Sequence, residues 1–195
     1  MSKTLQFYDQ NAETFVAYTQ EVDFSAVQNK FLDKVCKNGR ILDFGCGSGR
    51  DTRYFLEHGY TVKAIDGSKE LCQLASEYIG QPVQQMMFQE FDEVDAYDAI
   101  WACASILHLP MTELVDVLQS LGRGLHKQGI LYTSFKYGKF EGVRNGRFFT
   151  FLDEEGLSQL LAKVPMFHLE EKWITGDVRE GRECEQWMNL ILRKE

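Results

Sequence analysis

The sequence has few of the residues that divide a chain into domains or cross-link it. Its 195 residues include only three prolines, and we find no internal repeat or low-complexity tract that would mark a linker. The five cysteines are scattered, odd in number and never spaced as Cys-x-x-Cys, which is evidence against a disulfide framework and against a zinc site. We therefore predict one domain spanning residues 1–195, with reduced cysteines and no metal.

Positive charge and long apolar runs are also scarce. The net charge is −8, and because nucleic-acid binding relies on clustered Lys and Arg, we expect no nucleic-acid partner. The N-terminus lacks the apolar stretch of a signal peptide, and no apolar run approaches the roughly 18 residues of a membrane span. These absences predict a cytoplasmic protein without a membrane partner that acts on a small molecule.

Apolar strand patterns alternate with amphipathic helix patterns downstream of Gly39, which predicts a doubly wound α/β sheet. Only about ten residues separate the last two strands, too few for a helical crossover, so these strands should form an antiparallel hairpin. The expected strands are residues 40–44, 60–65, a segment ending at 88, 97–105, 129–137, 168–175 and 186–193. The expected helices are residues 51–57, 69–79, 112–125 and 154–164, with Ser68 and Asp153 as N-caps.

A glycine-rich turn follows the first of these strands. Residues 43–49 are Asp-Phe-Gly-Cys-Gly-Ser-Gly, with three glycines spaced by two. Glycine adopts positive φ and lets backbone approach a ligand closely, and the N-terminus of the following helix offers free N–H donors. Because a plain strand-to-helix turn needs only one glycine, the three predict a site for a nucleotide-like ligand.

Two acidic residues indicate which ligand fits. Asp43 stands at the end of the strand, where its carboxylate would repel a pyrophosphate but attract the ammonium and sulfonium of S-adenosylmethionine. The glycine spacing also differs from the Gly-x-Gly-x-x-Gly of dinucleotide sites. Asp66 ends the next strand and is placed to accept hydrogen bonds from both ribose hydroxyls. Each residue has a structural alternative, Asp43 as a cap or turn residue and Asp66 as a turn former.

These motifs resemble those of the class I S-adenosylmethionine-dependent methyltransferases. Residues 41–49 are similar to the first motif, residues 64–68 to the second, and residues 97–101 to the start of the fourth strand. Within that family the chain resembles the small bacterial branch of tellurite-resistance type. The resemblance implies a Rossmann-like, mostly parallel seven-stranded sheet of order 3-2-1-4-5-7-6, with the last strand antiparallel and helices on both faces.

The resemblance also implies an enzyme that transfers a methyl group from S-adenosylmethionine to a small-molecule acceptor and releases S-adenosylhomocysteine. Gln89 stands where family members often have Asp, and its carbonyl is an alternative acceptor for the adenine amino group. The resemblance implies that Asp43, Gly45 and Gly47 surround the methionine portion, Asp66 the ribose, and residues 87–89 the adenine, with residues 103–105 beneath the methyl group. The predicted cofactor-binding residues are Tyr18, Asp43, Gly45, Cys46, Gly47, Asp66, Gly67, Phe88, Gln89 and Ala104.

We expect three parts within the domain: a helical segment at 1–38, the cofactor-binding core at 39–137, and a loop, helix and hairpin on the acceptor side at 138–195. Tyr8, Phe15 and Tyr18 in the first part either dock the helix onto the sheet or cover the cofactor, with Tyr18 as the lid candidate. Beyond the fourth strand, His108 is the candidate catalytic base or orienting group, or a loop residue that packs before Pro110.

Basic residues concentrate in the last part of the chain, which suggests an anionic acceptor, although solvated loops also carry such residues. Two other functions compete with methyl transfer: a non-catalytic cofactor-binding or interaction domain of the same fold, and an NAD-dependent oxidoreductase, which the glycine spacing and Asp43 disfavour. The basic residues are Lys136, Lys139, Arg144, Arg147, Arg179 and Arg182.

Overall fold

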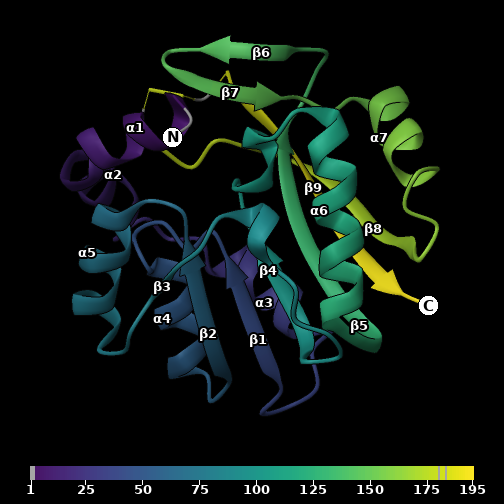
Figure 1. The fold of residues 1–195 in the computed structure, drawn as a ribbon, viewed down its shortest axis with the longest axis horizontal. Helices are drawn as coiled ribbons and strands as arrows, with labels where there is room; N and C mark the ends of the chain where they lie inside the picture. Colours follow the sequence, from purple (N-terminus) through teal and green to yellow (C-terminus); the bar gives the residue numbers. More distant parts are fainter. Residues whose placement is uncertain (1–2, 180, 183) are drawn as a thin grey trace.

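Seven strands form one mixed sheet in the structure, a computed structural model that describes residues 3–179, 181–182 and 184–195 (Figure 1). The strand order is β3-β2-β1-β4-β5-β9-β8, and β9 runs antiparallel to both of its neighbours. With β8 and β9 as the sixth and seventh strands of the predicted order, the Rossmann-like prediction is confirmed. The strands are β1 (Arg40–Phe44), β2 (Thr61–Asp66), β3 (Gln84–Gln85), β4 (Tyr97–Ala102), β5 (Leu125–Lys136), β8 (Phe167–Gly176) and β9 (Gln186–Lys194).

Helices cover both faces of the sheet because the central strands are apolar on both sides. In β1, Ile41 packs with the helices of one face, whereas Leu42 and Phe44 join the cluster on the other. Three helices cover the first face: α3 (Ser25–Leu32), α4 (Arg50–Glu57) and α5 (Lys69–Ile79). Two cover the second: α6 (Met111–Gly124) and α7 (Glu154–Leu161).

The local signals at the helix ends act as the sequence predicts. The Ser68 hydroxyl accepts a hydrogen bond from the N–H of Leu71 at 3.2 Å at the start of α5, and Asp153 accepts one from Gly156 at 2.8 Å at the start of α7. Gly80 ends α5 with a φ of 73°. Side-chain caps and a left-handed glycine therefore determine where these helices begin and end.

Two segments differ from the prediction. The strand expected to end at residue 88 consists only of Gln84–Gln85, an exposed edge pair, and Phe88–Glu90 form a short 3₁₀ turn. Within the stretch expected to be a loop, β6 (Glu141–Arg144) and β7 (Arg147–Thr150) form a separate hairpin. Its turn is Asn145-Gly146, both at positive φ, which is a typical two-residue hairpin connection.

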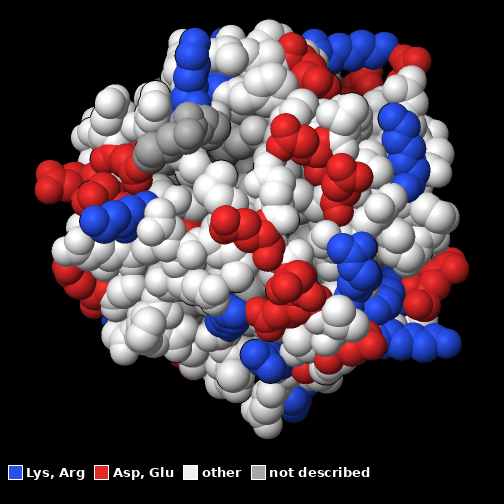
Figure 2. All heavy atoms as spheres, viewed as in Figure 1, with Lys and Arg blue, Asp and Glu red and all other residues white. Residues whose placement is uncertain are grey.

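The segments outside the sheet gather over the carboxyl ends of the parallel strands. In Figure 1 the arrowheads of β1 and β2 point toward α1 (Lys3–Gln10), α2 (Ala12–Thr19) and the β6–β7 hairpin. Side chains of both charges are interspersed over the face shown in Figure 2. Among the helices that the structure describes, none is both long enough and apolar enough to span a bilayer.

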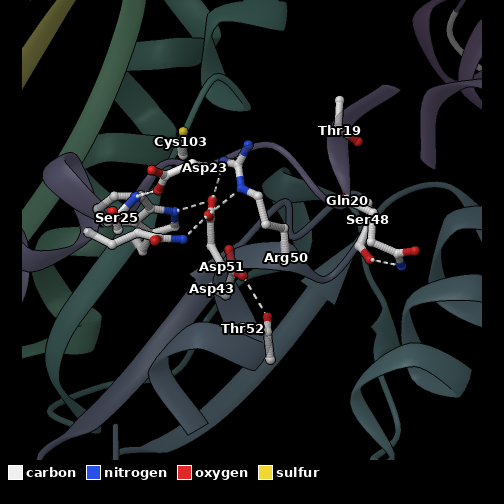
Figure 3. Close-up of polar contacts among 12 residues, drawn as sticks. Thr19, Gln20, Asp23, Ser25, Asp43, Ser48, Arg50, Asp51, Thr52 and Cys103 are labelled. Carbon is white, nitrogen blue, oxygen red and sulfur yellow. Dashed lines mark hydrogen bonds and ion pairs between the residues drawn. The ribbon is translucent and has the colours of Figure 1, made fainter. Parts of the chain in front are cut away.

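A buried carboxylate at the start of α4 joins three elements. Asp51, 7% exposed, accepts hydrogen bonds from Gln28 Nε2 of α3 at 2.7 Å and from Trp101 Nε1 of β4 at 2.8 Å. Arg50 donates to both of its oxygens, at 2.8 Å from Nε and 3.0 Å from Nη2 (Figure 3). The helix that follows the glycine turn is therefore anchored to the sheet through one side chain.

Replacing Asp51 with Ala should lower the free energy of unfolding by about 3 kcal/mol, because the partly buried Arg50 guanidinium and the buried N–H donors of Gln28 and Trp101 lose their acceptor. The measurement is urea unfolding followed by circular dichroism. Asp116→Ala, at an exposed position in α6, is the matched control and should change stability by less than about 0.5 kcal/mol. A loss below about 1 kcal/mol for Asp51→Ala would contradict the anchoring role.

Candidate functional site

A cavity of about 550 Å³ lies over the carboxyl ends of β1, β2 and β4, under α1, α2 and the β6–β7 hairpin. Its wall contains the glycine turn after β1, the tip of β2, the segment after β4 and residues of the β8–β9 connection. The structure brings most of the predicted site residues together in this wall: Gly45, Cys46, Gly47, Asp66, Gly67, Phe88, Gln89, Ala104 and His108.

The glycine turn leaves no room for side chains. Gly45 has a φ of 86°, and a Cβ atom built on it would lie 2.5 Å from the Cβ of Ser105. At Gly47, φ is 55° and a Cβ would lie 3.1 Å from the ring of Phe15. Both positions therefore require glycine, and the backbone of the turn borders the cavity directly.

The carboxylate of Asp66 faces the same part of the cavity. One of its oxygens accepts a hydrogen bond from the N–H of Gly47 at 3.0 Å, and the other accepts one from the N–H of Ser68 at 2.8 Å. Burial raises the pKa of this carboxyl above its usual value, and the backbone N–H donors partly oppose that shift. Because each oxygen has a further lone pair, Asp66 has the capacity to accept hydrogen bonds from a pair of hydroxyls.

Phe88 and Gln89 form the neighbouring part of the wall. The ring of Phe88 stacks on that of Phe44, with centroids 4.6 Å apart. The Gln89 amide donates from Nε2 to Glu113 at 2.6 Å. That bond orients the amide and leaves its carbonyl oxygen as the acceptor for a ligand.

Asp43 does not line the cavity. Its side chain is 1% exposed and accepts a hydrogen bond from the Thr52 hydroxyl at 2.6 Å, beneath the glycine turn (Figure 3). Burial, followed by the nearby charge of Asp51, raises its pKa well above the usual range. The predicted direct contact with a cationic ligand is therefore absent, and so is the alternative of a cap or turn residue: Asp43 lies within β1 and connects this strand to Thr52 of α4. Of these two neighbouring carboxylates, it is Asp51, which was not predicted from the sequence, that lines the wall.

Tyr18, the lid candidate, is also absent from the wall, and its side chain is 70% exposed. Tyr8 and Phe15 line the cavity instead, with their ring centroids 5.3 Å apart. Asn11 separates α1, which carries Tyr8, from α2, which carries Phe15 and Tyr18, and of the two rings in α2 it is Phe15 that faces the cavity. The aromatic density was a valid signal, but the sequence did not predict which rings face inward.

His108 forms hydrogen bonds through both ring nitrogens. Nδ1 lies 2.6 Å from the carbonyl oxygen of Phe148 and must carry a hydrogen to donate to it, which leaves Nε2 to accept the Tyr8 hydroxyl at 2.8 Å. Burial lowers the pKa of His108 to about 4. The imidazole is therefore neutral at pH 7, and it links α1 to β7 through two hydrogen bonds that span 100 and 40 residues of sequence.

The basic residues of the last part of the chain separate into two groups. Lys139 and Arg144 are exposed and lie outside the wall. Those in the wall are Lys136, Arg147, Arg179 and Arg182. The Lys136 ammonium pairs with Glu185, and Arg179 forms a two-pronged contact with Asp177 at 2.8 and 2.5 Å.

Part of the chain is similar to known methyltransferases. Residues 41–129 match the model of a family described as a methyltransferase domain. Among curated relatives, the Bacillus subtilis protein YqeM, named as a methyltransferase, is 32% identical over 51% of this chain and 45% of its own length. The N-terminal Xaa-Pro-Lys N-methyltransferase 1-A of Xenopus laevis is 34% identical over 48% and 46%. The chain spans about half the length of these two relatives.

Solved structures share the fold over almost the whole chain. The 1,6-didemethyltoxoflavin-N1-methyltransferase of Burkholderia thailandensis, with its substrate and S-adenosylhomocysteine bound, has a TM-score of 0.74 at 21% identity, covering 97% of this chain and 84% of that one. The magnesium protoporphyrin IX methyltransferase of Synechocystis, with S-adenosylhomocysteine bound, has a TM-score of 0.75 at 15% identity, covering 97% of each. The [4+2]-cyclase SpnF has a TM-score of 0.73 at 18% identity, covering 97% and 94%.

The low pKa of His108 gives stability a defined pH dependence. Its pKa is below the unfolded value of 6.5, so the unfolded chain binds the proton more tightly, and the contribution is full above about pH 6.5 and is lost as pH falls toward 4. We expect the wild type to lose about 2–3 kcal/mol more than His108→Gln between pH 7 and pH 4, measured by urea unfolding. His168→Gln, at an exposed position in β8, should retain the wild-type dependence. Equal pH slopes for wild type and His108→Gln would disprove this assignment.

Proposed function

We propose that this protein transfers a methyl group from S-adenosylmethionine to a small-molecule acceptor. The observation that carries the proposal is the juxtaposition, in one cavity wall, of a glycine turn that excludes side chains and the Asp66 carboxylate 3.0 Å from its backbone. These groups fit the cofactor. The Asp66 carboxylate offers oxygens that accept hydrogen bonds from the ribose hydroxyls, and the turn at Gly45 and Gly47 exposes backbone. Phe88 offers an aromatic ring and Gln89 an amide for the adenine. A binding site of this size suits drug-sized ligands, which occupy roughly 300–1,000 Å³.

Transfer depends on orientation more than on acid–base groups. As the bond from the sulfonium sulfur to the methyl carbon breaks, the acceptor's nucleophilic atom forms a bond to that carbon, and any proton it loses passes to water. The wall residues contribute by holding the reacting groups in line and by excluding water, so no catalytic triad is needed.

His108 is proposed here as a positioning residue for Tyr8 rather than as a strong base. A group with a pKa of about 4 is a weak base at pH 7, and Nε2 is already occupied by the Tyr8 hydroxyl. Because Tyr8 donates its hydrogen to His108, its oxygen is left to accept hydrogen bonds within the cavity. In this arrangement Tyr8 meets the acceptor, and His108 determines the direction of its hydroxyl.

We further propose that the domain is a class I S-adenosylmethionine-dependent methyltransferase of the tellurite-resistance-type branch, that it acts in the cytoplasm, and that its partner is a small molecule rather than a nucleic acid. The fold of the chain is shared with a cyclase as well as with methyltransferases, so fold alone does not determine the reaction.

The proposal is tested by calorimetric titration with S-adenosylmethionine, S-adenosylhomocysteine and NAD. We expect both sulfur compounds to bind and NAD not to bind. Asp66→Asn should weaken the binding of both at least about tenfold, because a neutral amide presents only one acceptor oxygen to the hydroxyls. Asp92→Asn, at an exposed loop position, is the matched control and should bind like the wild type.

Each alternative outcome has a distinct meaning. If neither sulfur compound binds at millimolar concentration, the proposed function is wrong, and binding of NAD would support the oxidoreductase. Binding of S-adenosylmethionine without methyl transfer to any of a broad panel of oxygen, nitrogen and sulfur nucleophiles would favour the non-catalytic alternative. Urea unfolding of Asp66→Asn separates loss of binding from loss of fold.

A further inference from the structure

The part of the cavity away from the glycine turn has a different chemistry from the cofactor side. Here the wall comes from α1, β7 and the start of β9, and aromatic rings dominate it. Phe149 connects the basic side chains of this region, with its ring centroid 5.1 Å from the guanidinium carbon of Arg147 and 5.5 Å from Nζ of Lys136. The aromatic residues of this region are Tyr8, Phe148, Phe149 and Trp187.

Two cations of this wall, Lys3 and Arg147, have no carboxylate partner among the described residues, but Lys3 is exposed to solvent whereas Arg147 is partly buried. The Arg147 guanidinium lies among the rings of Phe7, Phe149 and Tyr8, with centroids 4.5, 5.1 and 5.7 Å away. The hydrogen bond from Nη1 to the Tyr8 hydroxyl is long, at 3.4 Å, and the buried Nε has no hydrogen-bond acceptor. Lys136 and Arg179, by contrast, are paired with Glu185 and Asp177.

Such a cation is unfavourable unless something compensates its charge. Aromatic faces attract a guanidinium, but a buried charge is normally matched by a charge of opposite sign. Because Arg147 lines the cavity, a ligand bound there is able to supply the opposite charge. A guanidinium presents a planar set of N–H donors that matches the two oxygens of a carboxylate, which an ammonium does not.

Three basic side chains act on the Tyr8–His108 pair. Burial lowers the pKa of His108, and Arg147 and Lys136 lower it further. Burial raises the pKa of Tyr8, and this shift is opposed by Arg147 and Arg179 and reinforced by Asp66. These cations therefore gather around the Tyr8–His108 pair, close to where the acceptor would lie.

A purely structural role for Arg147 is the competing explanation. The Arg147 guanidinium contacts Phe7 and Tyr8 of α1, and a clamp between α1 and β7 would give the same contacts. That junction has other bonds, however: the N–H of Phe148 donates to the Thr4 hydroxyl at 2.9 Å, and Tyr8 donates to His108. A clamp also gives no reason for a charged residue to border the cavity.

We propose that the methyl acceptor is a small aromatic carboxylate, whose carboxylate binds Arg147 and whose ring packs against Phe149 and Trp187. This inference rests on the proposed function for the identity of the reaction, but recognition of the anion is measurable without the reaction. Arg147 is then the residue that determines specificity for a negatively charged acceptor.

The experiment compares benzoate with benzamide, a neutral probe of the same shape, by calorimetry on the full chain with and without saturating S-adenosylhomocysteine. We expect benzoate to bind at least about tenfold more tightly than benzamide. Arg147→Gln should bring the affinity for benzoate down to that for benzamide while leaving S-adenosylhomocysteine binding unchanged. Arg144→Gln, in the same hairpin but exposed and outside the wall, is the matched control and should keep the preference.

Equal affinities for benzoate and benzamide in the wild type, or no benzoate binding at millimolar concentration, would overturn the proposal, and both results are obtained without any variant. Retention of the benzoate preference in Arg147→Gln would overturn it as well. Failure of S-adenosylhomocysteine to bind would refute the proposed function instead. The benzoate measurement made without that compound would still decide whether the wall selects an anion.

Discussion

The site depends on the way the turn after β1 is held to the tip of β2. The N–H groups of Gly45 and Cys46 both donate to the carbonyl oxygen of Ile65, at 2.9 and 3.0 Å, and that of Gly47 donates to the Asp66 carboxylate. These bonds fix three consecutive backbone units against a neighbouring strand. A ligand at this edge therefore meets a preorganised backbone surface with a carboxylate already in place, so little ordering remains to be done on binding.

The surroundings of the turn stabilise it from below and enclose it from above. Below, Asp51 and Asp43 connect α4 to the sheet through Trp101 and Thr52. Above, the Tyr8–His108 hydrogen bond holds α1 against the β6–β7 hairpin. The first group therefore ties α4 to the sheet beneath the turn, and the second joins the elements that cover the cavity to one another.

In the proposed function, the two parts of the chain have different roles. The proposed cofactor side uses the glycine turn, Asp66 and the neighbouring strand tips, all of which lie within the matched segment of 41–129. The proposed acceptor side uses β7 and the β8–β9 connection, which lie beyond that segment. If the proposal is right, recognition of the acceptor depends on elements outside the matched segment, among them Arg147.

The sequence by itself determined the order of elements, the helix caps at Ser68 and Asp153, the glycine turn and the position of Asp66, because these depend on periodicity and backbone preferences over a few residues. Even the unpredicted β6–β7 hairpin carried a local signal in Asn145-Gly146. Tertiary structure decided the rest: that Asp51 and not Asp43 reaches the cavity, that Tyr8 covers it and Tyr18 does not, and that Arg147 lacks a carboxylate partner among the described residues. Each of these depends on which side chains are brought together by packing between distant segments, and no local pattern encodes that.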